Sequence, residues 1–249
     1  EYEDAFADSF GQPSGEFDGT AYDVLYEHDS EKLDVWAGYR HIEDGFRSDM
    51  GYRPKTDCRQ ARGGWSYTER ADAGNWYTSL GGGFGYVHEE EMDGGLLDSF
   101  LDYWLNYNGP MRSSIDVYGL FGRSEYSDLE YDRRTMSISG TIWPGGSTRL
   151  NLYTSFGDAV DYTNVQLADR LYVEPTLSFK AAQRLDVTLA HEYERLNVGD
   201  DRLYAANISY VRAAYQFTRR VFLRAVLQYV DYDYNREMYS DGRDRYRQF

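Results

Sequence analysis

Residues 184–194 read Arg-Leu-Asp-Val-Thr-Leu-Ala-His-Glu-Tyr-Glu, the clearest two-residue alternation of apolar and polar side chains in the chain. In an extended strand Leu185, Val187 and Leu189 fall on one face, and the polar residues between them fall on the other. The stretch therefore predicts a β-strand with one apolar and one polar face. The same alternation recurs in segments 33–42, 170–180 and 221–233.

Read with this period, the chain divides into about twelve segments of roughly ten to fourteen residues, a length typical of tilted membrane-spanning strands. In segment 203–217 the phase slips, because Ile208 and Tyr210 share one register and Val211 the other. This slip predicts a β-bulge near Tyr210. We predict strands at 20–28, 33–42, 59–70, 75–88, 96–108, 113–124, 134–143, 148–157, 170–180, 184–196, 203–217 and 221–233.

The connections between these segments alternate strictly between short turns and longer polar loops. Short turns are predicted at 29–32, 71–74, 109–112, 144–147, 181–184 and 218–220. Longer loops are predicted at 43–58, 89–95, 125–133, 158–169 and 197–202. The repeating unit is thus a β-hairpin, which favours an all-β, antiparallel up-and-down sheet. Closing such a sheet into a barrel removes its costly edges.

Twelve strands enclose a space too wide for side chains to fill, so an apolar interior would be unstable. The arrangement instead predicts a transmembrane β-barrel of a bacterial outer membrane, with apolar residues facing lipid and polar residues lining the lumen. The lipid-facing candidates are Leu33, Val35, Leu185, Val187, Leu189, Leu223 and Leu227. The lumen-lining candidates are Asp34, Arg40, Arg62, Asp102, Asp116, Arg149, Glu174, Lys180, Asp186, Glu192, Arg224 and Gln228. Aromatic girdles at the membrane interfaces are predicted from Trp65, Tyr67, Trp76, Tyr103, Tyr107, Tyr229 and Tyr232.

Residues 1–249 are expected to form a single β-barrel domain that is a fragment of a longer protein. If the short turns are periplasmic, segments 1–18 and 234–249 both lie on the extracellular side. Bacterial barrels keep both termini in the periplasm, so further closing strands are expected, giving 14 or more in the intact barrel.

Three stretches of the chain carry a family resemblance. The first is Phe46-Arg-Ser-Asp-Met-Gly-Tyr-Arg-Pro-Lys-Thr-Asp57. The second comprises 202–207, 215–224 and 228–229, and the third leads from Phe156-Gly-Asp158 to Arg184-Leu185. Over about residues 20–235 the chain thus resembles an uncharacterised bacterial outer-membrane family, which has Arg at the position of Lys55. The resemblance implies a C-terminal outer-membrane barrel preceded by a carbohydrate-binding-like module that this chain lacks, and it supplies no catalytic residues.

The composition and motifs weigh against several functions. With 26 Lys+Arg against 42 Asp+Glu the net charge is −16, which disfavours nucleic-acid binding. Cys58 is the only cysteine, and the chain shows neither a zinc-ligand spacing nor a GxSxG elbow. The glycine run 81–85 lacks the lysine and helix of a phosphate loop, so it indicates strand curvature or close backbone approach. We expect no enzymatic activity, no cofactor and no metal. The four histidines lie on different predicted strands: His28, His41, His88 and His191.

Two functions remain open. The first is a porin-like channel or translocation component for small polar or carbohydrate-like solutes, with a cation preference from the net charge of −16. The alternative is a non-catalytic scaffold or sheath that anchors or encloses a partner protein. The expected partners are outer-membrane lipid and possibly another protein or a periplasmic or extracellular domain. A soluble lipocalin-like binder would need eight strands and an apolar lumen.

Overall fold

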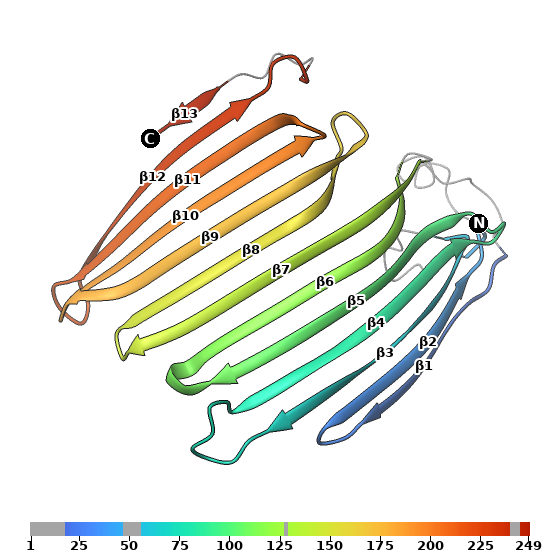
Figure 1. Cartoon of the computed structure of the whole chain (residues 1–249), viewed down its shortest axis with the longest axis horizontal. Helices are drawn as coiled ribbons and strands as arrows, with labels where there is room; N and C mark the ends of the chain where they lie inside the picture. The colour runs from blue at the N-terminus through green and yellow to red at the C-terminus, as the bar shows by residue number, and fades with distance from the viewer. Residues whose placement is uncertain (1–17, 47–55, 127–128, 240–244) are drawn as a thin grey trace.

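The computed structural model describes residues 18–46, 56–126, 129–239 and 245–249. They form one antiparallel sheet of thirteen strands, in which each strand pairs with the next along the chain (Figure 1). A short 3₁₀-helix, Pro110–Arg112, joins two of the strands. The strands are β1 Ala21–Asp29, β2 Leu33–Ile42, β3 Cys58–Arg70, β4 Ser79–Glu91, β5 Leu96–Gly109, β6 Ser113–Tyr126, β7 Leu129–Gly145, β8 Thr148–Asp161, β9 Gln166–Ala182, β10 Leu185–Val198, β11 Asp201–Gln216, β12 Phe222–Tyr234 and β13 Tyr246–Gln248.

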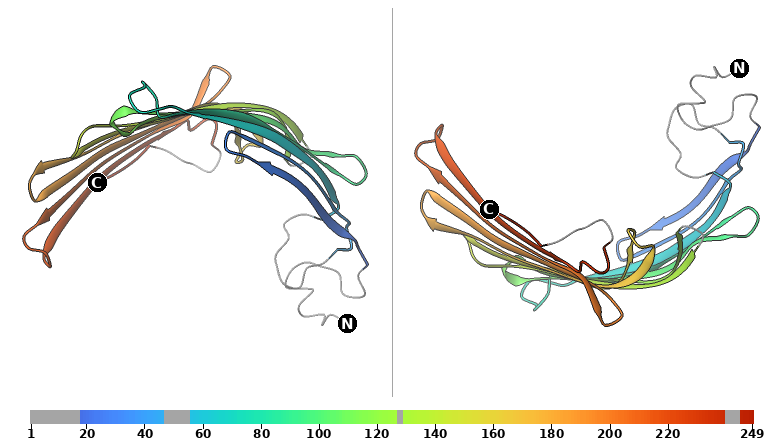
Figure 2. Two further views of the ribbon diagram at one scale, coloured as in Figure 1. Left: turned by 90° about the horizontal axis from the view of Figure 1, so that it is seen from below. Right: turned by 90° about the horizontal axis from the view of Figure 1, so that it is seen from above.

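The sheet is strongly curved, so that it has a convex and a concave side (Figure 2). Its two edges are β1 and β13, and these strands do not pair with each other within the described ranges. The curvature and the meander topology are those of a barrel wall. The predicted all-β, up-and-down fold is therefore confirmed.

The observed strands match the twelve predicted segments, with differences at the ends. Several run further into the long loops than predicted; β7 begins at Leu129 and β9 at Gln166. Cross-strand hydrogen bonds keep the polar ends of neighbouring strands paired beyond the apolar belt, so hydropathy alone underestimates their length. The short strand β13 was not predicted. It pairs with β12 from Val230 to Tyr232.

The predicted β-bulge near Tyr210 is wrong. The pairing of β11 with β10 is continuous from Leu185↔Tyr215 to Leu196↔Tyr204, and its pairing with β12 is continuous as well. Tyr210 faces Ala190 and Gln228 across the two ladders, where the small alanine side chain leaves room for the ring. The irregularity lies instead between Leu196 and Asn197, at the long-loop end.

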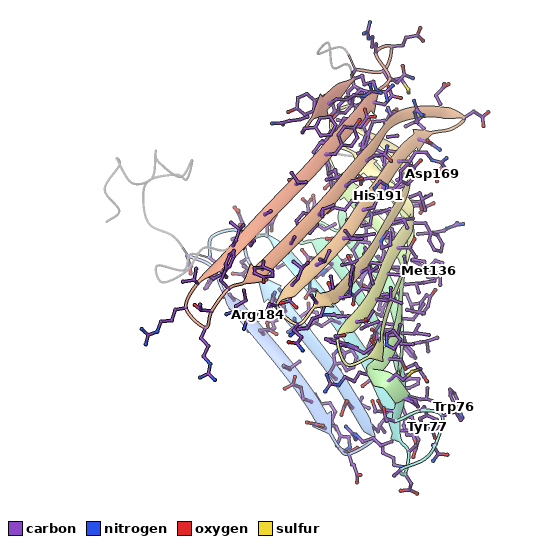
Figure 3. The ribbon with its side chains drawn as sticks, turned by 90° about the vertical axis from the view of Figure 1, so that its left-hand side faces the viewer. Trp76, Tyr77, Met136, Asp169, Arg184 and His191 are labelled. Carbon is purple, nitrogen blue, oxygen red and sulfur yellow. The ribbon has the colours of Figure 1, made fainter. Side chains whose placement is uncertain are left out.

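The pairing register sorts the side chains onto two faces. Met136, which shares its face with the apolar residues of neighbouring strands, lies on the convex side (Figure 3). The polar face is therefore the concave one. A small cluster of buried residues sits at the long-loop end of β9 to β12, where Leu203 is fully buried against Leu196 and Tyr239. Because the described residues form a single sheet, there is no second layer against which a large hydrophobic core could be buried.

Two girdle predictions need correction or refinement. Tyr232 lies on the polar face, because it pairs with Ala206, and its ring stacks on that of Tyr234 with centroids 5.8 Å apart. Trp76 lies in the turn between β3 and β4 rather than in a strand, and it stacks on Tyr107 at 5.8 Å. No helix within the described ranges is both long and apolar enough to cross a membrane.

Candidate functional site: an aromatic platform on the polar face

The register brings the twelve predicted lumen residues onto one face of the sheet, the concave polar face. The seven predicted lipid-facing residues all lie on the opposite face. In sequence the twelve residues span Asp34 to Gln228, so the up-and-down topology alone gathers them.

Several charged side chains on the polar face form hydrogen bonds or ion pairs with side chains of neighbouring strands. The Arg40 guanidinium donates to Asp23 at 2.7 and 2.8 Å, and Arg62 lies 3.5 Å from the same carboxylate. The Ser66 hydroxyl donates to Asp34 at 3.0 Å. These contacts satisfy charges that would otherwise be costly to desolvate.

Other polar-face charges are held by neutral groups. Asp116 accepts from the Asn106 amide at 2.7 Å and from the Ser139 hydroxyl at 3.4 Å. The Arg149 guanidinium donates to Asn151 at 2.8 Å. Glu174 accepts from the Tyr172 hydroxyl at 2.9 Å. Within the described ranges, no side-chain hydrogen bond or ion pair holds Asp102, Lys180, Asp186, Glu192, Arg224 or Gln228.

Two tryptophans from strands far apart in the sheet meet on the polar face. Trp36 comes from β2 and Trp104 from β5, and their rings stack with centroids 5.9 Å apart and planes inclined by 26°. Both side chains are half-buried. Trp104 also pairs directly with Tyr118 of β6. The result is an aromatic platform, defined here as Trp36, Trp104 and Tyr118, that crosses strands β2 to β6.

Glycines in the two intervening strands make this stacking possible. A side chain at Gly64 of β3 would overlap the Trp36 indole, and a Cβ at Gly83 of β4 would lie 2.6 Å from Cζ2 of Trp104. Glycine therefore lets each indole lie flat across the adjacent backbone, as expected where another group approaches a strand closely. The run 81–85 accordingly holds an aromatic pair in place rather than a phosphate.

Hydrogen-bonding groups surround the platform. The Asp102 carboxylate lies over Gly85, Asn106 follows on the same strand, and Asp116 lies opposite Asn106 on β6. An aromatic face beside carboxylate and amide groups suits a ligand with an apolar C–H face and a rim of hydroxyls, which is the chemistry of a sugar.

Sequence reasoning missed both tryptophans. Tryptophan is compatible with either face of a membrane strand, so Trp36 and Trp104 do not disturb the polar alternation. A signal was nevertheless present: Gly81, Gly83 and Gly85 occupy alternate positions of one strand and leave three polar-face positions without side chains. Such a gap indicates that neighbouring side chains cover the strand.

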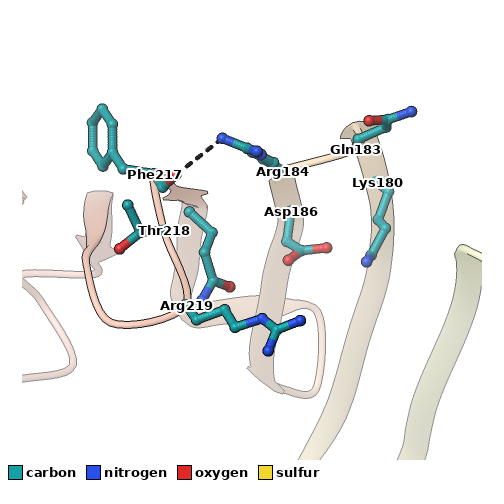
Figure 4. A pocket seen from close by; sticks show the side chains of 8 residues that line it. Lys180, Gln183, Arg184, Asp186, Phe217, Thr218 and Arg219 are labelled. Atoms are coloured by element: carbon teal, nitrogen blue, oxygen red, sulfur yellow. Dashed lines mark hydrogen bonds between the residues drawn. The ribbon is translucent and has the colours of Figure 1, made fainter.

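A second polar feature lies at the short-turn end of β9 to β12. A cavity of about 310 Å³ is lined there by Lys180, Arg184, Asp186 and Arg219, among others (Figure 4). The Arg184 guanidinium donates to the backbone oxygen of Phe217 at 3.0 Å, which fixes it across the turn. We call Lys180, Arg184 and Arg219 the basic rim. It offers three cations against one carboxylate in a chain that is otherwise acidic.

The four histidines occupy the convex face of four different strands, and none meets another. His191 is hydrogen-bonded to Ser209 at 2.9 Å, and His41 and His88 lie 3.7 and 3.6 Å from Glu43 and Glu90. In the part of the chain that the structure describes, no group of three His, Cys, Asp or Glu residues is placed to share a metal ion.

Comparison with known proteins adds information about the fold only. No protein-family model and no curated protein matches the chain. Among solved structures it is similar to in-vitro folded OmpT, an outer membrane protein of Vibrio cholerae, with a TM-score of 0.41 and 8% identity over 87% of this chain and 86% of that one. It is also similar to outer-membrane expressed OmpT of Vibrio cholerae, with a TM-score of 0.38 and 9% identity over 86% and 87%.

Both neighbours are outer-membrane proteins by name, and at these TM-scores the likeness concerns the fold of the sheet alone. Neither bears on the carbohydrate-binding-like module that the family resemblance implies. Of the segment 46–57 that carries part of that resemblance, residues 47–55 lie outside the described residues.

The prediction that the chain has no enzymatic activity requires correction. It relied on the absence of familiar catalytic motifs, and the comparison with two OmpT structures does not support it. Their likeness extends to the barrel fold, and a barrel fold is compatible with catalytic groups on its loops or its inner face. The exclusion of catalysis was therefore wrong as a deduction from sequence.

Proposed function

We propose that this sheet forms part of the wall of an outer-membrane channel, whose polar face lines a lumen that passes small polar or carbohydrate-like solutes. The twelve polar-face residues named above then meet water, and Leu185, Val187 and their equivalents meet lipid. The free edges at β1 and β13 would be costly in a bilayer, so further strands are expected to complete the barrel.

The observation that carries this proposal is the aromatic platform. The stacked Trp36–Trp104 pair lies on the same face as the charged and amide side chains named above, and it packs over glycines rather than in the buried cluster of β9 to β12. The accessible part of these half-buried rings can bind the C–H face of a passing sugar, while Asp102 and Asp116 accept hydrogen bonds from the sugar hydroxyls. Weak binding along a water-filled path permits both entry and release.

The test is single-channel conductance of the full-length protein in a planar bilayer, with maltose or another neutral oligosaccharide added. We expect a steady current that the sugar interrupts. In a Trp104→Ala variant the sugar concentration that half-blocks the current should rise roughly three- to tenfold, corresponding to about 0.5–1.5 kcal/mol for one aromatic contact.

Trp76→Ala is the matched control, because this tryptophan lies in a turn away from the platform and should leave the block unchanged. An unaltered block in Trp104→Ala would contradict the platform's role. A correctly inserted barrel that conducts nothing and co-purifies with a single protein would replace the channel by a sheath around that partner.

A further inference from the structure

A groove on the convex face combines an apolar floor with arginines. It crosses β4 to β7 towards the long-loop end and has a volume of about 500 Å³. One continuous line of paired residues forms its floor and side: Tyr86↔Leu101, Leu101↔Phe121 and Phe121↔Arg134. Arg123 is the next residue of β6 on this face towards the loops, and it lies opposite Asp132. We call this set the convex groove.

The floor of the groove is open to the surroundings. Tyr86, Leu101 and Phe121 are 45%, 43% and 46% exposed, although all three are large hydrophobic residues. The Tyr86 hydroxyl is hydrogen-bonded to Ser99 at 3.1 Å, so the ring is held along the edge of the groove. On a membrane-facing surface such a floor is suited to an acyl chain.

The two arginines are weakly engaged. Arg123 lies 3.6 Å from Glu130 and 4.0 Å from Asp132, distances longer than those of a hydrogen-bonded pair, and all three side chains are mostly exposed. The Arg134 guanidinium has no hydrogen bond or ion pair with another described residue; its backbone N–H donates to Asp158. Arg123 and Arg134 are diagonal neighbours on one face, so both can reach a single anion.

An arginine at the rim of a lipid-facing surface needs an anionic partner at the headgroup level. A guanidinium binds a phosphate through two parallel hydrogen bonds, which makes phosphate a better partner than a single point charge. Long loops project to the extracellular side of outer-membrane barrels, so this rim lies in the outer leaflet. The lipid there that carries phosphate directly above its acyl chains is the phosphorylated glycolipid of that leaflet.

We propose that the convex groove binds this phosphorylated glycolipid, with one phosphate between Arg123 and Arg134 and an acyl chain along Leu101 and Phe121. Asp132 lies directly opposite Arg123 and Glu130 lies further towards the loop, and both carboxylates are exposed enough to turn away from the phosphate. The inference rests on the proposed outward orientation of the convex face, but it does not require that the barrel conduct.

The test is binding of purified lipid A to the full-length protein in detergent, followed by native mass spectrometry. We expect diphosphorylated lipid A to bind at least about tenfold more tightly than dephosphorylated lipid A, because charge-assisted hydrogen bonds to phosphate are lost in the latter. An Arg123→Gln/Arg134→Gln variant should lose about tenfold in affinity for the diphosphorylated form. Retention of heat-modifiable migration on gels shows that the variant is folded.

Arg195→Gln is the matched control. Arg195 is an exposed arginine on the convex face of β10, but it lies outside the groove, so its substitution should leave binding unchanged. Equal weakening by Arg195→Gln, or unchanged binding by the double variant, would overturn the proposal. Equally tight binding of phosphatidylglycerol would overturn the assignment to the glycolipid. Binding without any conductance would leave this site standing and contradict only the channel.

Discussion

Gly83 determines whether Trp104 can lie across β4. Its missing side chain leaves space both for the indole and for the carbonyl oxygen of Trp65 on the adjacent strand. We predict that Gly83→Ala lowers the free energy of unfolding by about 1–3 kcal/mol, because the added methyl group overpacks this contact. Urea unfolding in detergent, followed by tryptophan fluorescence, would measure the change.

Gly146→Ala provides the comparison, because no atom lies within 4 Å of the position its methyl group would take. This variant should unfold like the native protein. If Gly83→Ala were as stable as Gly146→Ala, the close packing of Trp104 over β4 would be disproved. If Gly83→Ala instead abolished the sugar block without lowering the stability, the Trp104 indole would have been displaced while the sheet remained folded.

The two-residue alternation predicts which face of the sheet a residue lies on, but it does not predict which side chains come into contact. Asp186 and Val187 were assigned to opposite faces by period alone, and the pairing register separates them in the same way. The contact between Trp36 and Trp104 could not be derived in this manner. It requires the side chains to reach over two other strands, and it therefore depends on register and on glycine positions together.

Strand β11 illustrates the limit of hydropathy for a whole element. Ile208 and Tyr210 are apolar in type, yet they pair with Glu192 and Gln228 on the polar face. Near the sheet edge the concave face also carries apolar residues. In the sequence, an apolar residue at a polar-face position looks the same as a one-residue shift of the alternation. Continuous hydrogen bonding on both sides of the strand, not hydropathy, shows that β11 contains no extra residue at Tyr210.

This reading of β11 predicts a labelling pattern in liposomes. In a Cys58→Ser background, Tyr210→Cys should react with a water-soluble thiol reagent, whereas Val211→Cys, on the face proposed to meet lipid, should not. Asp186→Cys and Val187→Cys on β10 are the reference pair, with reaction expected only at 186. Reaction at 211 and protection at 210 would mean that β11 is bulged after all. Reversal in both strands would invert the proposed faces.

The net charge of −16 is distributed unevenly over the whole molecule. The twelve predicted lumen residues hold five cations and six carboxylates, so 5 − 6 leaves a balance of only −1. These twelve residues alone therefore do not account for the cation preference expected from the net charge. On the polar face of β4 and β5, Glu89, Glu91 and Asp98 lie at the long-loop end, whereas the basic rim lies at the short-turn end of β9 to β12.

A conducting pore with opposite charge at its two mouths passes current more easily in one direction than in the other, because each mouth enriches a different ion. We predict a rectifying current–voltage curve at low salt that becomes linear near 1 M, where the Debye length falls to about 3 Å. Lys180→Gln/Arg219→Gln should reduce the rectification. Lys32→Gln is the control: Lys32 lies in the β1–β2 turn, where its hydrogen bond with Glu69 raises its pKa and its charge is already paired at 2.9 Å. A linear curve at low salt, or an equal effect of Lys32→Gln, would show that the basic rim does not lie at the mouth of the conducting path.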